Sequence, residues 1–498
     1  MSKYLVIIIY LIFISLGLPD SLLGSGRPVM QKEFDVDSSY AGYISMTITG
    51  VTIISALFSA QITNLLTEKW VMIISISLTV IGLILYSLAK EYWHFFPYAI
   101  PYGLGAGTID ASLNNFVAIH YSSRVMNFLH CFYGVGSMIS PNVMALALKY
   151  KSWREGYRWT AYIQTGILVI CFATIPLWKI EKSDKNDKNE KKEDEDNKDN
   201  DSKKEIESSE NRIIKIKVSK LDINEDKDKD KEIETKEAFS KKLTIEEKEK
   251  EKEKEKEKEK EEEKEKNKTN EEKEKPKVLS ILEALKIKGV IFSCLSFFTY
   301  CSGESTCFLW TSSFFDSTKE GLSKEAIASL STTIFGGLML GRFISGIISE
   351  KLGDKKLIRL GLLIEIIGII CVGIPIKTYV LAVIGYCLTS IGMGPIFPSA
   401  QHLVPLYFGK DASSTITGLQ MASAYGASTF MPFIFGLIQS KTSMWAHPIY
   451  VGLFAILNCI FIEIEFKLCD NNIIDNNNDN KEIKDNKENN ENNNEEMK

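Results

Sequence analysis

Long apolar stretches separated by short polar connections make up most of the chain. Twelve of them reach the length of about 20 residues that an α-helix, rising 1.5 Å per residue, needs to cross the hydrocarbon core of a bilayer. They are 4–26, 40–66, 70–89, 93–119, 125–148, 160–180, 286–312, 325–349, 356–374, 378–402, 411–437 and 446–467. The first has almost no basic region before it and no small-residue cleavage site after it, so we interpret it as a retained helix. The pattern predicts an all-α polytopic membrane protein with twelve transmembrane helices.

Average composition conceals this pattern. The 498 residues are 25% charged and the net charge is -5, values typical of a soluble protein. The charges, however, concentrate in 181–280, where Glu246–Lys266 contains only Glu and Lys, and in an Asn-rich tail. Neither segment can bury a core, so both are predicted to be disordered. The expected organisation is a six-helix half at 1–180, a charged low-complexity cytosolic loop at 181–280, a second six-helix half at 281–468 and a disordered tail at 469–498.

Weak similarity relates the two halves. Offsets of 284 to 292 residues bring Gly50 over Gly336, Asn114 over Gln401, Tyr133-Gly134 over Tyr425-Gly426, and Asp20-Ser21 over Glu304-Ser305. Small changes of offset are what different loop lengths in duplicated halves would produce. Two parallel six-helix halves of this kind can rock against each other around a central polar cavity.

Carboxyl groups inside three predicted spans are candidate cation-coupling residues. Asp20 lies in the first span, Asp110 in the fourth and Glu304 in the seventh. A charge at the centre of a spanning helix costs roughly 2.5–3.5 kcal/mol, so such residues face a bundle interior or water and have a function or a partner. A purely structural acid, paired with a lysine or a backbone group, is the alternative for Asp20 and Glu304.

Other polar and aromatic residues of the spans are candidates for solute binding. Asn114 lies one turn after Asp110, so an acid and a carboxamide share one helix face. Asn127, His130 and Tyr133 follow at intervals of three and also share roughly one face. The set of candidates is Asn114, Asn115, Asn127, His130, Tyr133, Trp310 and Gln401. For His130 and for the aromatic residues, simple packing is the alternative.

A compact charge cluster follows the eighth predicted span in "GRFISGIISEKLGDKK". Glu350, Lys351 and Lys355 can form ion pairs at the membrane surface, and Gly353 permits a tight turn. Single surface pairs contribute little, but a network that forms and breaks between the halves could latch one state. These four residues are therefore candidate gating residues.

Nothing in the sequence indicates an enzyme. The nine cysteines show no C-x-x-C spacing and no clustering with histidine, so we expect buried apolar thiols and no metal site. No nucleophile–base pair is apparent among the spans. No cofactor is expected apart from a coupling ion, and the predicted partners are the lipid bilayer and a small solute, with no nucleic acid and a monomeric state.

Several motifs together resemble the major facilitator superfamily. "GIISEKLGDKK" is similar to the loop signature of that family, with Glu350 where Asp is usual. "PDSLLGSGRP", "GLGAGTIDASLNNF", "RVMNFLHCFYGVGSMISP", "YCSGESTCFLW" and "IGMGPIFPSA" resemble its fucose permease and sodium-dependent glucose transporter branch. The resemblance implies that Asp20 and Asp110 serve cation coupling and that Asn114 is the carboxamide of the motif. Asp110 replaces the Glu of the fucose permease pattern and Asn115 its proline, so the substrate and the ion stay open.

The resulting hypothesis is a secondary active transporter of a small hydroxylated solute, a sugar being favoured, coupled to H⁺ or Na⁺ by alternating access. An exporter of amphipathic compounds and a non-transporting nutrient sensor are the alternatives. The protein is expected in the plasma membrane or an endomembrane. Basic residues are balanced between the two sides, so cytosolic placement of both termini rests on the family resemblance and the even number of spans.

Overall fold

The computed structural model describes residues 3–36, 39–178 and 278–496. The chain divides into a unit made of Met1–Trp178 with Pro276–Lys498 and a second unit, Lys179–Lys275. Nearly all of the predicted charged loop lies outside the described residues. The first unit contains both predicted six-helix halves.

Helices cover each of the twelve predicted spans. The first half contains α1 (Lys3–Gly17), α2 (Leu22–Phe34), α3 (Ser39–Leu57), α4 (Ser59–Leu66), α5 (Glu68–Ser87), α6 (Phe95–His120), α7 (Ser123–Tyr150) and α8 (Trp153–Ala173), with short 3₁₀ turns at Tyr92–His94 and Ile175–Trp178. The second half contains α11 (Ile281–Leu285), α12 (Val290–Thr318), α13 (Lys324–Leu352), α14 (Asp354–Gly373), α15 (Val380–Met393), α16 (Ile396–Phe408), α17 (Lys410–Gln439) and α18 (Ala446–Glu496).

Length and apolar composition alone qualify six of the described helices as membrane spans, or up to seven when the bent pair α3–α4 counts as one. Helices such as α12 are long enough but carry many hydroxyl side chains. In α12, Thr299, Ser302, Thr306 and Thr311 are buried and donate hydrogen bonds to carbonyl oxygens one turn earlier. These bonds satisfy the hydroxyl groups locally, so a helix of modest hydropathy can still lie in a bundle.

Three predicted spans are broken helices rather than continuous ones. The first is interrupted at 18–21, which contains Pro19, and the tenth ends α15 at Met393 and restarts at Ile396 after Gly394-Pro395. Proline lacks the N–H that would continue the hydrogen-bond ladder. The second span bends by 58° between α3 and α4. The break in the first span places Asp20 outside regular helix, at the level of the bundle interior.

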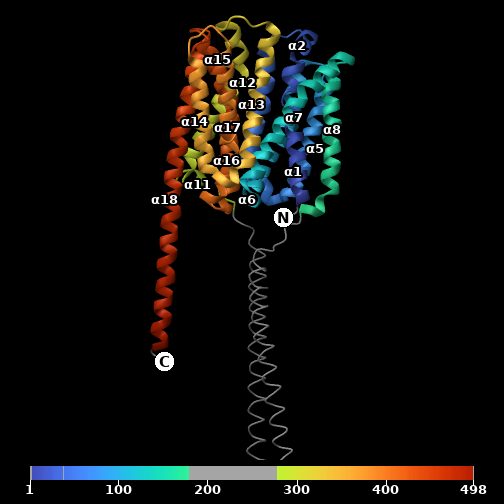
Figure 1. Ribbon diagram of the computed structural model, residues 1–498. Coiled ribbons are helices and arrows are strands. Elements are labelled where there is room, and N and C mark those ends of the chain that lie inside the picture. The colour runs from blue at the N-terminus through green and yellow to red at the C-terminus, as the bar shows by residue number, and fades with distance from the viewer. Residues whose placement is uncertain (1–2, 37–38, 179–277, 497–498) are drawn as a thin grey trace, which may run out of the picture. The chain divides into compact units, whose positions relative to one another are not determined.

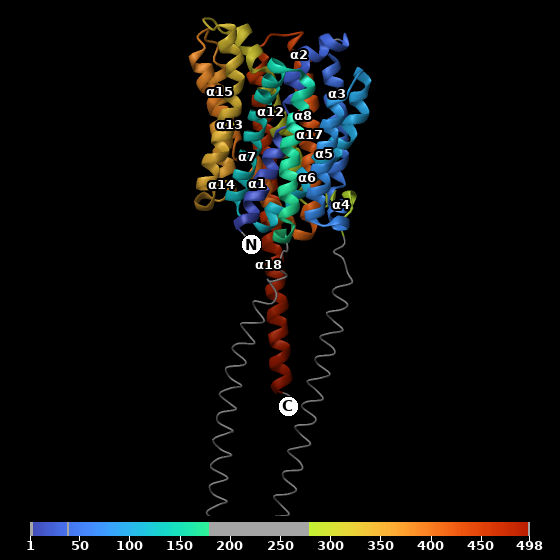
Figure 2. The same cartoon turned by 90° about the vertical axis from the view of Figure 1, so that its right-hand side faces the viewer.

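The two halves pack against each other mainly through α3, α4, α6 and α7 of the first half and α13, α16 and α17 of the second. In Figure 1 the blue-to-green helices of the first half lie beside the yellow-to-red helices of the second. The contacting pairs include α7 with α13, α3 with α17, and α6 with both α16 and α17. The view in Figure 2, turned by 90°, shows α7 and α13 side by side. Two buried apolar clusters lie within the first half. The large cluster of the second half reaches across the interface to Ala56 and Ala111 of the first.

Glycines of the "GLGAG" run bring α6 close to a neighbouring helix. A Cβ atom at Gly103 would lie 2.9 Å from the carbonyl oxygen of Ile48, and one at Gly107 would lie 2.3 Å from that of Thr52. Both contacts hold α6 against α3. These glycines therefore allow α6 and α3 to approach closely.

We expect Gly107→Ala to destabilise the protein by about 1–3 kcal/mol, because the added methyl group forces α6 away from α3. The matched control is Gly166→Ala in α8, where a Cβ atom would meet nothing within 4 Å; removing this glycine from a helix should be neutral or slightly stabilising. Thermal unfolding of both purified variants in the same detergent gives the comparison. Equal stability of the two variants would contradict the close-packing argument.

The tail differs from its predicted state. We predicted disorder from 469 onward, whereas α18 continues as a helix to Glu496. A helix satisfies its backbone hydrogen bonds locally, so it can extend beyond a bundle without burying a core. The side chains from Asn472 onward lie outside the described part of the chain.

Candidate functional site

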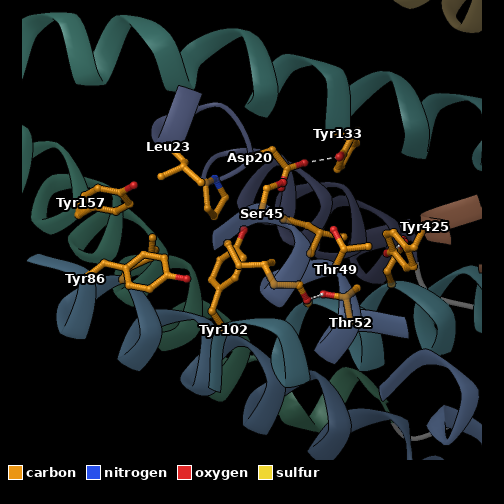
Figure 3. Close-up of a pocket in the computed structure, with 16 residues that line it drawn as sticks. Asp20, Leu23, Ser45, Thr49, Thr52, Tyr86, Tyr102, Tyr133, Tyr157 and Tyr425 are labelled. Atoms are coloured by element: carbon orange, nitrogen blue, oxygen red, sulfur yellow. Dashed lines mark hydrogen bonds between the residues drawn. The ribbon is translucent and has the colours of Figure 1, made fainter. Parts of the chain in front are cut away.

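A cavity of about 250 Å³ lies within the first half and reaches the second half at one residue, Tyr425. Its polar lining consists of two carboxyls, five tyrosines and three aliphatic hydroxyls (Asp20, Asp110, Tyr86, Tyr102, Tyr133, Tyr157, Tyr425, Ser45, Thr49 and Thr52). Figure 3 shows the tyrosine and carboxyl side chains converging from several helices. The volume falls just below the range of roughly 300–1,000 Å³ typical of ligand pockets, so the cavity suits a small molecule.

Asp20 lines this cavity from the break between α1 and α2. The side chain is exposed to the cavity and accepts a hydrogen bond from the hydroxyl of Tyr133 in α7 (Figure 3). Close packing of α1 on α7 produces this pairing, because a Cβ at Gly17 would lie 2.2 Å from the carbonyl oxygen of Tyr133 and one at Gly136 would lie 2.2 Å from that of Ile14. The acid therefore faces an internal space and not the lipid.

Asp110 is the centre of a hydrogen-bond chain. Asn114, one turn later on α6, donates to the Asp110 carboxylate at 2.9 Å, and its own side-chain oxygen lies 3.0 Å from Nε2 of His130. The hydroxyl of Tyr425, from α17 of the other half, also donates to Asp110. The expected shared face of Asp110 and Asn114 is thus present, and the chain links α6, α7 and α17.

Glu304 is in a different environment from the other two acids. It accepts a hydrogen bond from Tyr300 at 2.9 Å and forms an ion pair with the buried guanidinium of Arg342 in α13 at 3.3 Å. Arg342 also donates to the backbone carbonyl of His130 in the first half at 3.2 Å. Glu304 is therefore compensated by a cation of its own half, whereas the hydrogen bonds of Asp20 and Asp110 come from neutral groups.

The remaining solute-binding candidates lie away from the cavity lining. Asn115 accepts a hydrogen bond from Ser413 of the second half at 2.7 Å, and Asn127 donates to the backbone of Ser123 in its own helix at 3.0 Å. Gln401 is buried and donates to Thr417 at 3.0 Å, while the indole of Trp310 donates to the carbonyl of Pro432. In this conformation Asn115, Gln401 and Trp310 join different helices, whereas Asn127 is bonded within α7. For all four, a contact with solute stays a prediction.

Sequence reasoning missed several residues of the site. Tyr86, Tyr102 and Tyr157 line the cavity, but tyrosines in apolar spans are too common for a pattern to single them out. Arg342 did leave a signal. It is a basic residue inside the predicted span 325–349, where an isolated charge is costly, so it could have been matched with Glu304.

Polar contacts close the gap between the halves at the end where α6 ends and α7 begins. Arg124 pairs with Glu350 at 2.8 Å, and Ser123 donates to Asp354. His402 connects Asp354, at 2.7 Å, with the carbonyl of Tyr121, at 3.1 Å. The cavity lies toward the opposite end, because Tyr86 is near the end of α5 and Tyr102 near the start of α6.

Of the four candidate gating residues, one forms an ion pair between the described parts of the two halves and the others do not. Glu350 joins the halves through Arg124, whereas Lys355 pairs with Asp470 of its own half. Lys351 is exposed, and Gly353 adopts φ +75°, a conformation that favours glycine, in the turn between α13 and α14. Glu350 is thus the candidate in a position to act as a latch.

We expect Glu350→Gln to raise the population of the state open at this end, but only modestly. Both partners of the Arg124–Glu350 pair are about half exposed (46% and 47%), and such pairs contribute at most about 1 kcal/mol, or roughly a fivefold change in population. Distances between spin labels at Ser122 and Lys356 would report the change. Glu463→Gln is the matched control, because its pair with Arg359 is similarly exposed but lies within one half; an equal effect of both variants would contradict the latch.

Comparisons with known proteins agree with this architecture. The model of the Major Facilitator Superfamily matches residues 9–432 and 294–467. Among solved structures, the MFS transporter FucP in the outward conformation gives a TM-score of 0.65 at 14% identity, covering 93% of this chain and 99% of that chain. The proton:xylose symporter XylE bound to 6-bromo-6-deoxy-D-glucose gives 0.63 at 12% identity, covering 93% and 95%. A comparison with curated proteins finds no match.

These likenesses decide the family and the fold. At 12–14% identity the structural neighbours establish a shared fold, and the family match spans more than half of the chain. The predicted major facilitator fold and the resemblance to the fucose permease branch are confirmed at that level. The chain belongs to the Major Facilitator Superfamily and is an integral, multi-pass membrane transporter, not an enzyme.

Proposed function

We propose that this transporter moves a small hydroxylated solute of the sugar class, coupled to H⁺ or Na⁺, by alternating access. The observation that carries the proposal is the composition of the cavity, in which two carboxyls lie among tyrosine, serine and threonine hydroxyls. Hydroxyl and carboxyl groups can bind the several hydroxyls of a sugar, and the tyrosine rings can stack on its apolar face. The sugar:proton symporters among the structural neighbours support the same class.

Asp110 is the proposed coupling residue. Its carboxylate accepts a hydrogen bond from Tyr425 of the opposite half, and a charged acceptor makes a stronger bond than a neutral one. Binding of H⁺ or Na⁺ neutralises the carboxylate and so weakens a contact that joins the halves. The ion thereby changes the balance between two arrangements of the halves, which is the requirement for coupling.

The membrane potential limits how far the solute can be concentrated. One charge moved through 100 mV supplies about 2.3 kcal/mol, which corresponds to roughly fifty-fold accumulation at about 1.36 kcal/mol per tenfold change. The test is uptake of radiolabelled hexoses by proteoliposomes with imposed pH or sodium gradients. Accumulation driven by one gradient supports the proposal and identifies the ion; uptake that neither gradient changes would contradict coupling.

Both termini are proposed to be cytosolic, in the plasma membrane or an endomembrane. With that orientation the polar contacts around Glu350 close the cytosolic end, and the cavity lies toward the opposite side. The charged loop carries two glycosylation sequons, at Asn200 and Asn267. Glycosylation of either would place the loop on the other side and contradict this orientation.

A sensor on a transporter scaffold is the second candidate, favoured only by the long charged loop. Deletion of 185–275 separates the two functions. A transporter should keep gradient-driven uptake without the loop, since the carboxyls proposed to bind ion and solute lie in the first helical half. A sensor should keep solute binding and lose its signal.

A further inference from the structure

The two acidic side chains of the cavity have no basic counterpart among the described residues that line it. Asp20 and Asp110 both line it, and among the described residues none of the other lining side chains is Lys, Arg or His. In the second half, by contrast, the buried Glu304 has Arg342 as its partner. Carboxyl groups in a poorly solvated space either take up a proton or need a cation as partner. No described lining residue supplies that cation, so for these two acids it would be the coupling ion or the solute. One coupling ion compensates one of the two acids.

The two acids differ in how far their side chains are exposed to the cavity. Asp110 is partly buried and receives the hydroxyl of Tyr425 and the amide of Asn114. Asp20 accepts hydrogen bonds from the hydroxyls of Tyr133 and Tyr102, but its side chain is the more exposed of the two acids to the cavity. A carboxylate has about four acceptor positions, so Asp20 has both the remaining positions and the access that a donor on the solute needs.

Unsatisfied hydroxyls mark a second contact region. The side chains of Tyr86 and Tyr157 line the cavity, are each only 2% exposed, and have hydroxyl groups without a hydrogen-bond partner in the described part of the chain. Figure 3 shows them on the side of Asp20 away from Tyr425. Buried hydroxyls are normally paired. Each of these oxygens has almost no accessible surface, so a hydroxyl group of the solute would satisfy them once the two side chains turn toward the cavity.

We propose that the natural solute bears a protonated amino group as well as hydroxyls, and that Asp20 binds the ammonium group. The Tyr86 and Tyr157 hydroxyls bind hydroxyls of the solute, and the surrounding aromatic rings favour a cation further. An aminosugar or a similar polyhydroxylated amine has this chemistry. The inference rests on the proposed function and divides the two acids: Asp110 takes the coupling ion, and Asp20 takes the charge of the solute.

Binding of glucose and glucosamine to the full-length protein in nanodiscs tests the inference at a pH where the amine is protonated. A charge-assisted hydrogen bond in place of a neutral one should make glucosamine bind at least about tenfold more tightly. Asp20→Asn should bring the ratio of the two affinities close to one, whereas Asp20→Glu should retain most of the preference. Asp316→Asn is the matched control, because this exposed acid of α12 does not line the cavity.

Each outcome is decisive. Tyr86→Phe and Tyr157→Phe should weaken both ligands alike and leave the ratio unchanged, since the hydroxyls do not contact the amine. Equal or tighter binding of glucose, or a preference that survives Asp20→Asn but is lost in Asp110→Asn, would overturn the assignment while leaving sugar transport intact. Failure of both ligands to bind would contradict the proposed sugar class itself.

Discussion

Asp110→Asn is expected to abolish concentrative uptake while exchange of solute across the membrane partly persists. The amide is nearly the same size as the carboxyl. Its oxygen can still accept from Asn114, and its NH₂ group can donate to the hydroxyl of Tyr425, so the fold around α6 should be retained. It cannot bind a proton or sodium ion in the same way, so the ion gradient no longer drives the solute. The expected loss is the whole of the roughly fifty-fold accumulation that 100 mV supports.

Two assays on the same proteoliposomes separate the effects. Gradient-driven uptake measures coupling, and counterflow between equal solute pools measures movement of the binding site across the membrane. Asp316→Asn, the same chemical change on an exposed acid outside the cavity, should leave both unchanged. Accumulation against a gradient by Asp110→Asn would refute the assignment of this residue.

Local sequence pattern predicted part of the site because part of the site is local. Asp110 and Asn114 are one turn apart, so helix geometry alone places them on one face, and the structure joins them at 2.9 Å. The pairing of Asp20 with Tyr133 was not predictable in this way. It depends on Gly17 and Gly136 bringing α1 and α7 together, a tertiary contact without a local signal.

The fold was predictable to a similar degree. The long apolar stretches of the sequence located every span, because the thickness of the bilayer sets a minimum length for each spanning helix. They did not locate the interruptions, since a stretch such as 40–66 is equally apolar whether it runs straight or bends by 58° at Phe58. Proline marked the other two interruptions, at Pro19 and Pro395, and these could have been predicted.

The similarity between the two halves of the sequence predicted more equivalent polar sites than the structure contains. The alignment of Asp20 with Glu304 indicated equivalent acids in the two halves, but their surroundings have diverged. Asp20 is exposed to the cavity, and Glu304 is paired with Arg342. A coupling role for Glu304 stays a prediction, and the ion pair supplies its structural alternative. The two can be separated by experiment.

Either single substitution, Glu304→Gln or Arg342→Met, is expected to destabilise the protein by about 3–5 kcal/mol. The exposed fractions of the two side chains are only 15% and 7%, and removing one partner of a buried ion pair leaves the other charge uncompensated. The double variant removes both charges together. It should therefore be less destabilised than the sum of the single variants, which is the signature of direct coupling.

Unfolding of the purified variants in detergent measures these differences in stability. Glu320→Gln is the control, because both partners of the Glu320–Lys377 ion pair are largely exposed. This substitution should have no measurable effect on stability. Additive effects of the two substitutions would show that the pair does not act as a unit.

Gradient-driven uptake by the double variant then decides the role of Glu304. If the acid serves only to neutralise Arg342, the double variant keeps concentrative uptake, because Asp110 and Asp20 are untouched. If Glu304 binds the coupling ion, uptake is lost although stability is recovered.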